Sequence, residues 1–399
     1  MKIFFAFLLI IFLAFSGYHL SFRGFRLPVP ARKFYLTGTE FLFLGLLLGP
    51  EFGNIFDARI IQGLDPLSGL VLGWVGLLFG YQFEVNKLRR FPPGYFQAAF
   101  LEGMVTFAFV FGGCFFVQFL LYEAVSQTGL AICITLAAFS ACTAQTGLSL
   151  VAPDLITRRR ETVHLLRYIS SFDGLIALIL FSVVFLMRSQ PDATSVWERV
   201  LALRVFLIFV VVLGFLLLYV LFFTERRSSD ELVLVMIGMA VLTSGTATIL
   251  NFSPLIINFL MGVCLVNFSR QKERIYHILS SVEKPVYIML MAFLGLSWKI
   301  DSLVPIVFAV LFTGWRFVGK LAGGGIVRRL LDGVDRFPGF LGLGLLDPGG
   351  LSLAVLLDYQ RGGAGGAADV AVSMAVISVI FSDMLSMVCL QRLFKKEIR

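Results

Sequence analysis

Long apolar runs alternate with short charged segments along the whole 399-residue chain. About twenty apolar residues are enough for a helix to cross a bilayer, so each run predicts one transmembrane span. The runs cover residues 3–20, 35–50, 66–83, 97–120, 127–151, 163–187, 200–223, 231–250, 253–268, 284–298, 302–325, 338–358 and 367–391. The pattern therefore predicts an all-α, polytopic membrane protein of about 13 helices, in which the short runs 35–50 and 253–268 could instead be re-entrant.

Composition agrees with this class, because 58% of the residues are hydrophobic, against roughly 45–50% in soluble domains. The sequence has no HExxH, GxxxxGK[ST] or GxSxG motif, so it offers no signature of a zinc protease, a phosphate-binding loop or a serine hydrolase. The five cysteines lie in apolar runs without CxxC spacing, and the three histidines form no metal-spaced pair. We expect no enzyme activity, no cofactor and no transition-metal site.

The basic residues indicate the orientation of the chain. When each is assigned to its nearest loop, 24 of the 33 lysines and arginines follow odd-numbered spans. Cytoplasmic loops carry the excess of basic residues, which predicts a cell-membrane protein with its N-terminus outside and its C-terminus in the cytoplasm. Only Lys2 precedes the first span, unlike a signal peptide, so we expect that span to be retained. The net charge of +8 then reflects topology and does not indicate a nucleic-acid partner.

Three short sequence echoes suggest an internal repeat of six plus six spans around a linking seventh. Gly49 precedes Asn54 by five residues after span 2, as Gly262 precedes Asn267 in span 9. LFGYQFEVNKL resembles FLGLSWKIDSL in span 10, and TGLSLV at 146–151 resembles GGLSLAV at 349–355. All three echoes share a seven-span offset, which reverses the crossing direction, and inverted repeats of this kind are typical of secondary transporters.

Spans 5 and 12 are the candidates for discontinuous helices. Span 5 contains SACTAQTG, which is rich in small and hydroxyl residues, and span 12 contains LLDPGG. Pro348 lacks an amide hydrogen, while Gly349 and Gly350 relax the backbone. Interrupted backbone within a membrane is tolerated only against protein or water, so two facing breaks predict a polar pocket.

Ionisable side chains inside spans are functional candidates because a central charge costs roughly 2.5–3.5 kcal/mol. They are Glu40, Glu102, Asp173, Arg316, Lys320, Asp347, Asp358 and Asp383. Asp173 in span 6 and Arg316 in span 11 adjoin the two predicted breaks, which makes them a candidate ion pair. Glu102, Lys320 and Asp358 lie near the ends of their predicted spans, where reaching the interface favours a structural role.

These stretches together resemble the monovalent cation:proton antiporter superfamily, in its thirteen-span branch, over nearly the whole chain. The resemblance rests on the order and spacing of TGTEFLFLGLLLGP, GLLFGYQFEVNKLRR, SFDGLIALILF, SPLIINFLMGVCLVN, GWRFVGKLAGG and LGLLDPGGLSLAVLL. It implies scaffold helices, usually the dimer interface, at residues 1–96 and 231–300. It also implies a mobile core at 97–190 and 301–399, with a linking helix at 191–230.

The family's essential span-6 aspartate matches Asp173, and its span-11 basic residue matches Arg316. The family's polar break residues fall on Thr143, Ala144, Gln145 and Thr146, and the second break is Asp347, Pro348, Gly349 and Gly350. Relatives generally have Asp, Asn or Gln before the essential aspartate, where this chain has Phe172. A second carboxylate there accompanies electrogenic exchange in the family, so Phe172 argues for electroneutral exchange.

The expected function is antiport of Na⁺ or K⁺ against H⁺ by alternating access with one shared aspartate. Ionised Asp173 would bind the cation together with oxygens of Ser170, Thr143 and the span-5 break (Gln145, Thr146), since hard cations prefer oxygen ligands. Arg316, with Lys320, would compensate charge, holding either the break carbonyls or Asp173. Membrane lipid and a second copy of the chain are the expected partners. An ion channel, a solute symporter and a non-transporting sensor or scaffold remain the alternatives.

Overall fold

The computed structural model describes residues 2–21, 39–122, 126–144, 160–188, 229–299, 304–330, 340–362 and 366–395, together with Gly214. Every regular element in these ranges is helical. The helices are α1 (Lys2–Ser21), α3 (Thr39–Leu48), α4 (Ala58–Gly63), α5 (Asp65–Gly80), α6 (Val85–Leu88), α7 (Pro93–Tyr122), α8 (Gln127–Ala141), α10 (Arg160–Arg188), α12 (Ser229–Ile249), α13 (Pro254–Phe268), α14 (Lys272–Ser281), α15 (Glu283–Leu296), α16 (Val304–Leu330), the 3₁₀ helix η1 (Leu341–Leu345), α17 (Gly350–Arg361) and α18 (Gly366–Lys395). The all-α prediction is confirmed.

Each predicted span except the seventh overlaps a described helix: the twelfth overlaps both η1 and α17, and the fifth overlaps α8. The seventh, 200–223, lies outside the described residues apart from Gly214. Within the described ranges, five helices are long and apolar enough to cross a membrane, and a sixth if α14 and α15 form one bent span. The helices α3, α5, α8 and α13 are apolar but shorter. Short and interrupted helices therefore explain why fewer spans pass a length test than the sequence pattern predicts.

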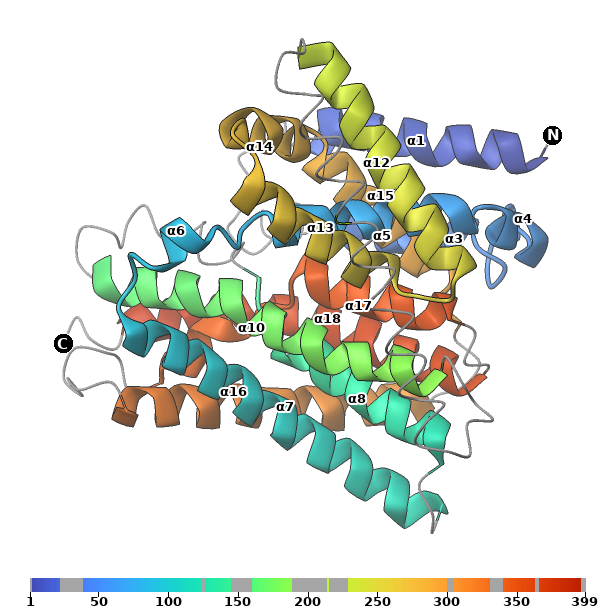
Figure 1. The fold of residues 1–399 in the computed structure, drawn as a ribbon. Helices are drawn as coiled ribbons and strands as arrows, with labels where there is room; N and C mark the ends of the chain where they lie inside the picture. The colour runs from blue at the N-terminus through green and yellow to red at the C-terminus, as the bar shows by residue number, and fades with distance from the viewer. Residues whose placement is uncertain are drawn as a thin grey trace, which may run out of the picture.

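The helices pack in two groups that lie one above the other in Figure 1. One group contains α1, α3, α5, α12, α13 and α15, and its closest pairs are α5 with α13 and α3 with α15. The other contains α7, α8, α10, α16, α18 and η1, with α7 packed along α16. Helix α17 contacts both groups, reaching α8 on one side and α5, α13 and α15 on the other.

Glycines allow the closest helix pairs in the first group to meet. A Cβ atom added to Gly80 of α5 would lie 2.1 Å from the carbonyl oxygen of Phe259 in α13, and one added to Gly295 of α15 would lie 2.0 Å from that of Leu42 in α3. Only glycine fits at such distances, which suits membrane helices that associate through small residues. These are also the two glycines that the seven-span offset aligns, and the offset maps the α3–α15 contact onto the α5–α13 contact.

The outward faces of the bundle are apolar. Phe4, Phe5 and Phe12 of α1 are each more than 60% exposed, and Leu234 of α12 is 71% exposed. In water such a surface would be unfavourable, whereas a lipid environment accepts it. Four charged side chains, Glu102, Asp173, Arg316 and Lys320, are instead buried inside the bundle, which separates the lipid-facing surface from a polar interior.

Candidate functional site

The two predicted breaks lie against each other in the middle of the bundle. Helix α8 ends at Ala141, because Cys142 adopts an extended conformation. On the other side, η1 ends at Leu345 and α17 begins at Gly350 after Gly349, which is also extended. The amide of Ala144 donates to the carbonyl of Asp347 at 2.7 Å. Span 12 is therefore interrupted, as predicted, whereas for span 5 the structure shows that α8 ends at Ala141, and residues 145–151 lie outside the described residues. The two segments satisfy part of each other's backbone hydrogen bonding.

Arg316 of α16 satisfies the carbonyl groups that these breaks leave open. Its guanidinium donates to the carbonyls of Ser140 (3.3 Å), Cys142 (3.2 Å) and Leu346 (2.6 Å), and to Ser382 Oγ (3.2 Å). The last carbonyls of a helix have no intrahelical partner and carry partial negative charge. The rigid fork of five donors in arginine suits several such acceptors at once. Arg316, which is 1% exposed, thus cross-links both breaks with α18.

The predicted pairing of Asp173 with Arg316 is wrong in one respect: Lys320 is the basic side chain at the carboxylate. Lys320 Nζ lies 3.5 Å from Asp173 Oδ2. Lys320 follows Arg316 by one helical turn, so both side chains face the breaks. The guanidinium of Arg316 is held by the carbonyls at the end of α8 and by that of Leu346, which leaves the next turn of α16 to reach Asp173.

Lys320 is fully buried, and its ammonium lies within 3.5 Å of four acceptor groups. Besides Asp173, they are a carboxylate oxygen of Glu102 (3.2 Å), the carbonyl of Ala141 (2.7 Å) and Thr143 Oγ1 (2.9 Å). Glu102 and Asp173 are both 0% exposed. The expectation that Glu102 and Lys320 reach the membrane interface is therefore wrong, because both side chains lie in the interior of the bundle.

Glycines bring the three helices of this cluster together. A Cβ on Gly323 of α16 would lie 3.1 Å from the Glu102 carbonyl oxygen, and one on Gly319 would lie 3.2 Å from the Thr106 Cα of α7. On the other face of α7, a Cβ on Gly103 would lie 3.7 Å from the Cα of Asp173. Such close packing of backbones is typical of small-xxx-small motifs in membrane helices. It is the sequence signal that could have located Glu102 and Lys320 inside the bundle.

A cavity of about 720 Å³ reaches Asp173 from one end of the bundle. Its inner part is lined by Asp173, Thr143, Ala144, Ser170, Gly349 and Gly350, and its outer part by Gln82, Tyr276, Glu283 and Lys284. The Oδ1 atom of Asp173 is buried and has no hydrogen-bond partner among the described residues. A buried carboxylate oxygen of this kind, next to hydroxyl and carbonyl oxygens, is a donor set that suits a monovalent cation or a proton.

The other predicted ligands of the site are placed as follows. Ser170 lines the cavity while its hydroxyl donates to the carbonyl of Arg167 at 3.1 Å. Thr143 Oγ1 accepts from Lys320 and donates to the carbonyl of Leu345 at 3.4 Å. Gln145 and Thr146 lie outside the described residues. The structure therefore brings two of the four predicted oxygen ligands to the cavity that Asp173 lines.

Phe172, the residue before Asp173, belongs to an aromatic cluster. Its ring stacks on Tyr168 with centroids 4.6 Å apart and meets Phe83 and Phe96 edge-on at 5.3 and 5.6 Å. These rings come from α10, from the segment after α5 and from α7. Aromatic pairs in such arrangements stabilise helix packing. The residue before Asp173 thus fixes α10 against its neighbours and does not line the cavity.

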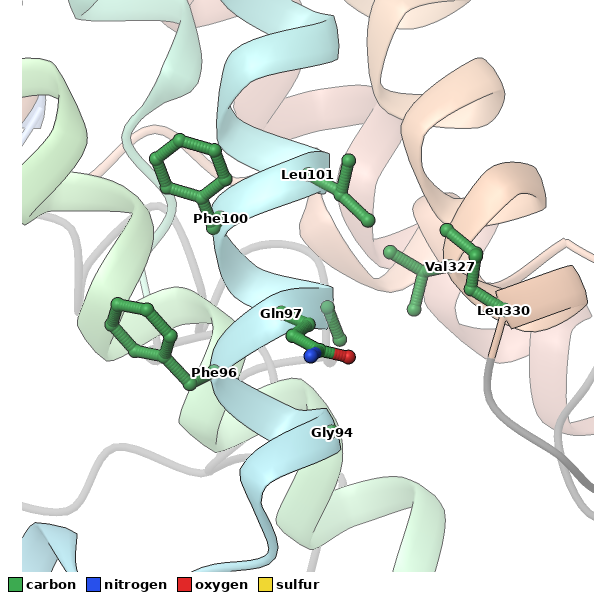
Figure 2. Close-up of a pocket in the computed structure, with 8 residues that line it drawn as sticks. Gly94, Phe96, Gln97, Phe100, Leu101, Val327 and Leu330 are labelled. Carbon is green, nitrogen blue, oxygen red and sulfur yellow. The ribbon is translucent and has the colours of Figure 1, made fainter.

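A smaller pocket of about 180 Å³ lies between the start of α7 and the end of α16. In Figure 2, Gln97 and Leu101 project toward Val327 and Leu330, whereas Phe96 projects toward the neighbouring helix. The lining is apolar except for the amide of Gln97 and shares no residue with the larger cavity. No charged side chain lines it, so the ion chemistry belongs to the Asp173 cavity.

Polar contacts close the bundle at the end opposite the cavity mouth. Arg361 at the end of α17 makes a bidentate ion pair with Asp65 at the start of α5, at 2.7 and 2.8 Å. Nearby, Ser253 donates to Asp358, and Gln360 Nε2 donates to the carbonyl of Ser297 at 2.8 Å. Helices α5, α15 and α17 each line the cavity at one end and carry one of these contacts at the other. Among the described residues, the cavity therefore opens toward the end of the bundle that carries Tyr276 and Lys284.

Comparisons with known proteins agree with this architecture. The family model for the transmembrane sodium/hydrogen exchanger matches residues 8–396. Among solved structures, the chain is similar to the sodium proton antiporter MjNhaP1 from Methanocaldococcus jannaschii at pH 8, with a TM-score of 0.68 and 16% sequence identity, over 99% of this chain and 100% of that chain. At this identity the likeness shows the fold. The search of curated proteins gave no match. Because the family model spans nearly the whole sequence, the chain belongs to the transmembrane sodium/hydrogen exchanger family.

Proposed function

We propose that the protein is an electroneutral antiporter that exchanges Na⁺ or K⁺ for H⁺ through the single carboxylate of Asp173. The observation that carries the proposal is a fully buried carboxylate at the inner end of a cavity of about 720 Å³, beside two interrupted helices. A carboxylate in that place binds either a proton or a bare cation. Exchange follows if the site changes sides only when it is occupied.

The cation would bind to oxygen atoms only. Asp173 supplies Oδ1, Thr143 and Ser170 supply hydroxyl oxygens, and the backbone carbonyls after α8 are further candidates. Hard monovalent cations prefer such ligands. We extend the set to Gln145 and Thr146 because they directly follow Ala144 in the same break. A proton arriving at Asp173 removes the charge that holds the cation, so the two substrates exclude each other.

Electrostatics explains why a site without cation or proton should not change sides of the membrane. The ammonium of Lys320 lies 3.5 Å from Asp173, and a buried charge is expensive without a compensating one. A bound cation or proton neutralises Asp173, whereas the empty carboxylate stays held by Lys320. Arg316 contributes by keeping the ends of both breaks in position. Guanidinium stays charged at every physiological pH, so Arg316 is not a proton carrier.

Alternating access is supported by the asymmetry of the bundle. The cavity leads to Asp173 from one end, while the Asp65–Arg361 pair and its neighbours close the other end. The helices around Asp173 (α7, α8, α10, α16, α17, α18) would act as the mobile core, and those around α5 and α13 as the scaffold and dimer interface. Tyr276 and Lys284 line the mouth of the cavity, and both follow the ninth predicted span. Loops after odd-numbered spans carry the basic residues and are expected in the cytoplasm, so the cavity would open to the cytoplasm.

The proposal is tested in proteoliposomes loaded with a fluorescent pH indicator, to which Na⁺, K⁺ and Li⁺ are added in turn. Cation-dependent proton flux that Asp173→Asn abolishes, and that an imposed membrane potential does not drive, is the expected result. Cation flux without a countertransported proton would identify a channel. Folded protein without any cation-dependent flux would identify a non-transporting sensor or scaffold.

A further inference from the structure

Glu102 has an arrangement that the exchange cycle above does not use. Its side chain, which extends from α7, is 0% exposed, and its carboxylate lies 3.2 Å from Lys320 Nζ. Thr106, one turn later on the same helix, donates its hydroxyl to Glu102 at 3.1 Å. Burying a carboxylate at a membrane helix centre is costly, and a helix contact alone would not require one.

The ammonium of Lys320 stands between two carboxylates from different helices. It lies 3.2 Å from Glu102 and 3.5 Å from Asp173, and its contacts to Ala141 and Thr143 hold it at the end of α8. A cation that binds Asp173 brings a second positive charge next to this ammonium. At low effective dielectric constant two like charges at such separations repel strongly. The ammonium therefore needs another acceptor at the moment the cation binds.

We propose that Glu102 is a positioning residue for exchange, which takes over the Lys320 ammonium when a cation occupies Asp173. The inference rests on the proposed function, because it concerns the same site. Two carboxylates and one ammonium carry one net negative charge, which either a single cation or a single proton cancels. Both loaded states are then neutral, and neutrality is what lowers the cost of moving the site through a low-dielectric core.

The close packing of α7 against α16 supports this role. Gly319 and Gly323 flank Lys320 on the face that meets Thr106 and Glu102, so the carboxylate and the ammonium are carried by backbones in near contact. The distance between them is therefore set by helix packing. The hydroxyl of Thr106 fixes the carboxylate further. Glu102 is thus pre-positioned, and only the lysine side chain has to shift.

The test compares Glu102→Gln with the double variant Glu102→Gln/Lys320→Gln in the proteoliposome assay. In the single variant the ammonium has only Asp173 as a carboxylate partner and competes with the cation. We expect the apparent KM for the cation to rise about tenfold or more, with a much smaller change in the rate at saturating cation. Removing the ammonium as well should return KM to the wild-type value or below.

The matched control is Asp369→Asn, which removes a carboxylate of α18 that pairs with Lys299 and does not line the cavity, and which should leave KM within about twofold. An unchanged KM in Glu102→Gln, or a double variant that fails to restore KM, would overturn the inference while leaving Asp173 exchange intact. If wild-type protein shows no coupled flux, the proposed function itself fails. Should Glu102→Gln not fold, Glu102→Asp replaces it: an intermediate rise in KM supports the inference and an unchanged KM contradicts it.

Discussion

Arg316→Met is the substitution whose effect on stability follows most directly from the structure. It replaces a guanidinium that is 1% exposed by an apolar side chain of similar length. The substitution removes four hydrogen bonds and leaves the carbonyls of Ser140, Cys142 and Leu346 without that donor. These carbonyls belong to the two breaks, so the ends of both interrupted helices lose their shared anchor.

The magnitude can be worked from these contacts. A buried polar group left unsatisfied costs about 1–3 kcal/mol, and three carbonyls would give the sum of three such terms. Removing the charge also removes its own desolvation cost, which offsets part of that sum. We therefore expect the free energy of unfolding to fall by about 3–5 kcal/mol, the usual range when one partner of a buried charged contact is lost. Arg316→Lys keeps the positive charge but not the forked donor geometry of the guanidinium, so its free energy of unfolding should fall by about half as much as that of Arg316→Met.

The assay is equilibrium unfolding in mixed micelles with an increasing fraction of sodium dodecyl sulfate, followed by tryptophan fluorescence. Arg329→Met is the matched control, because Arg329 is an exposed arginine in the last turn of the same helix. It should change the free energy of unfolding by no more than about 0.5 kcal/mol. A loss below about 1 kcal/mol in Arg316→Met, as small as that of an ordinary surface substitution, would refute the assignment of Arg316 as the anchor of the breaks.

Three other regions give predictions. Arg361→Gln breaks the bidentate pair with Asp65. It should shift the equilibrium between the two access states about fivefold toward the state that is open at the Asp65 end of the bundle. Pulsed electron paramagnetic resonance between spin labels on α5 and α17 measures this shift, and an unchanged distance distribution would argue against a gating contact. Outside the membrane, hydrogen bonds from Lys272 and Lys87 lower the pKa of Glu84, so its contribution to stability is present above the pKa of the unfolded chain and is lost as pH falls through the lower folded pKa. Thermal unfolding of Glu84→Gln should accordingly depend less on acidic pH than that of the wild type, and parallel curves would contradict this. Gly80→Val, which forces a side chain against the Phe259 carbonyl, should destabilise by about 2–3 kcal/mol, whereas Gly238→Val, with open space around it, should be nearly neutral in the same unfolding assay.

The hydrophobic pattern was sufficient to predict the long helices among the described residues, and the residue types predicted the end of α8 and the interruption between η1 and α17. The apolar runs are much longer than the uncertainty in their boundaries. A Pro-Gly-Gly sequence interrupts a membrane helix because proline lacks an amide hydrogen and glycine relaxes the backbone, which are properties of the residues themselves. The buried position of Asp173 beside the breaks could also be predicted, because a single carboxylate in an apolar run must face the interior of the bundle. Its distances to other side chains depend on helix packing, which the one-dimensional pattern does not contain.

Glu102 and Lys320 show where that limit lies. The apolar run that contains Glu102 begins at residue 97, but α7 begins at Pro93, so Glu102 lies about 13 Å along the helix at 1.5 Å per residue. Likewise α16 continues to Leu330, ten residues past Lys320. Both helices extend beyond their apolar runs, and two side chains expected at the interface lie in the interior. The sequence could not tell whether Arg316 or Lys320 pairs with Asp173. The carbonyls at the end of α8 hold Arg316, and Lys320, one turn later, is the residue that reaches Asp173.

The central claim is that one carboxylate, Asp173, holds either the cation or the proton. It is tested most directly by counting the protons released when Na⁺ or K⁺ is added to purified protein in a weakly buffered detergent solution, at the pH where transport is half-maximal. The account predicts that cation binding releases protons from the wild-type protein, and that Asp173→Asn neither binds the cation nor releases a proton. Cation binding without proton release in the wild type, or normal release from Asp173→Asn, would contradict it.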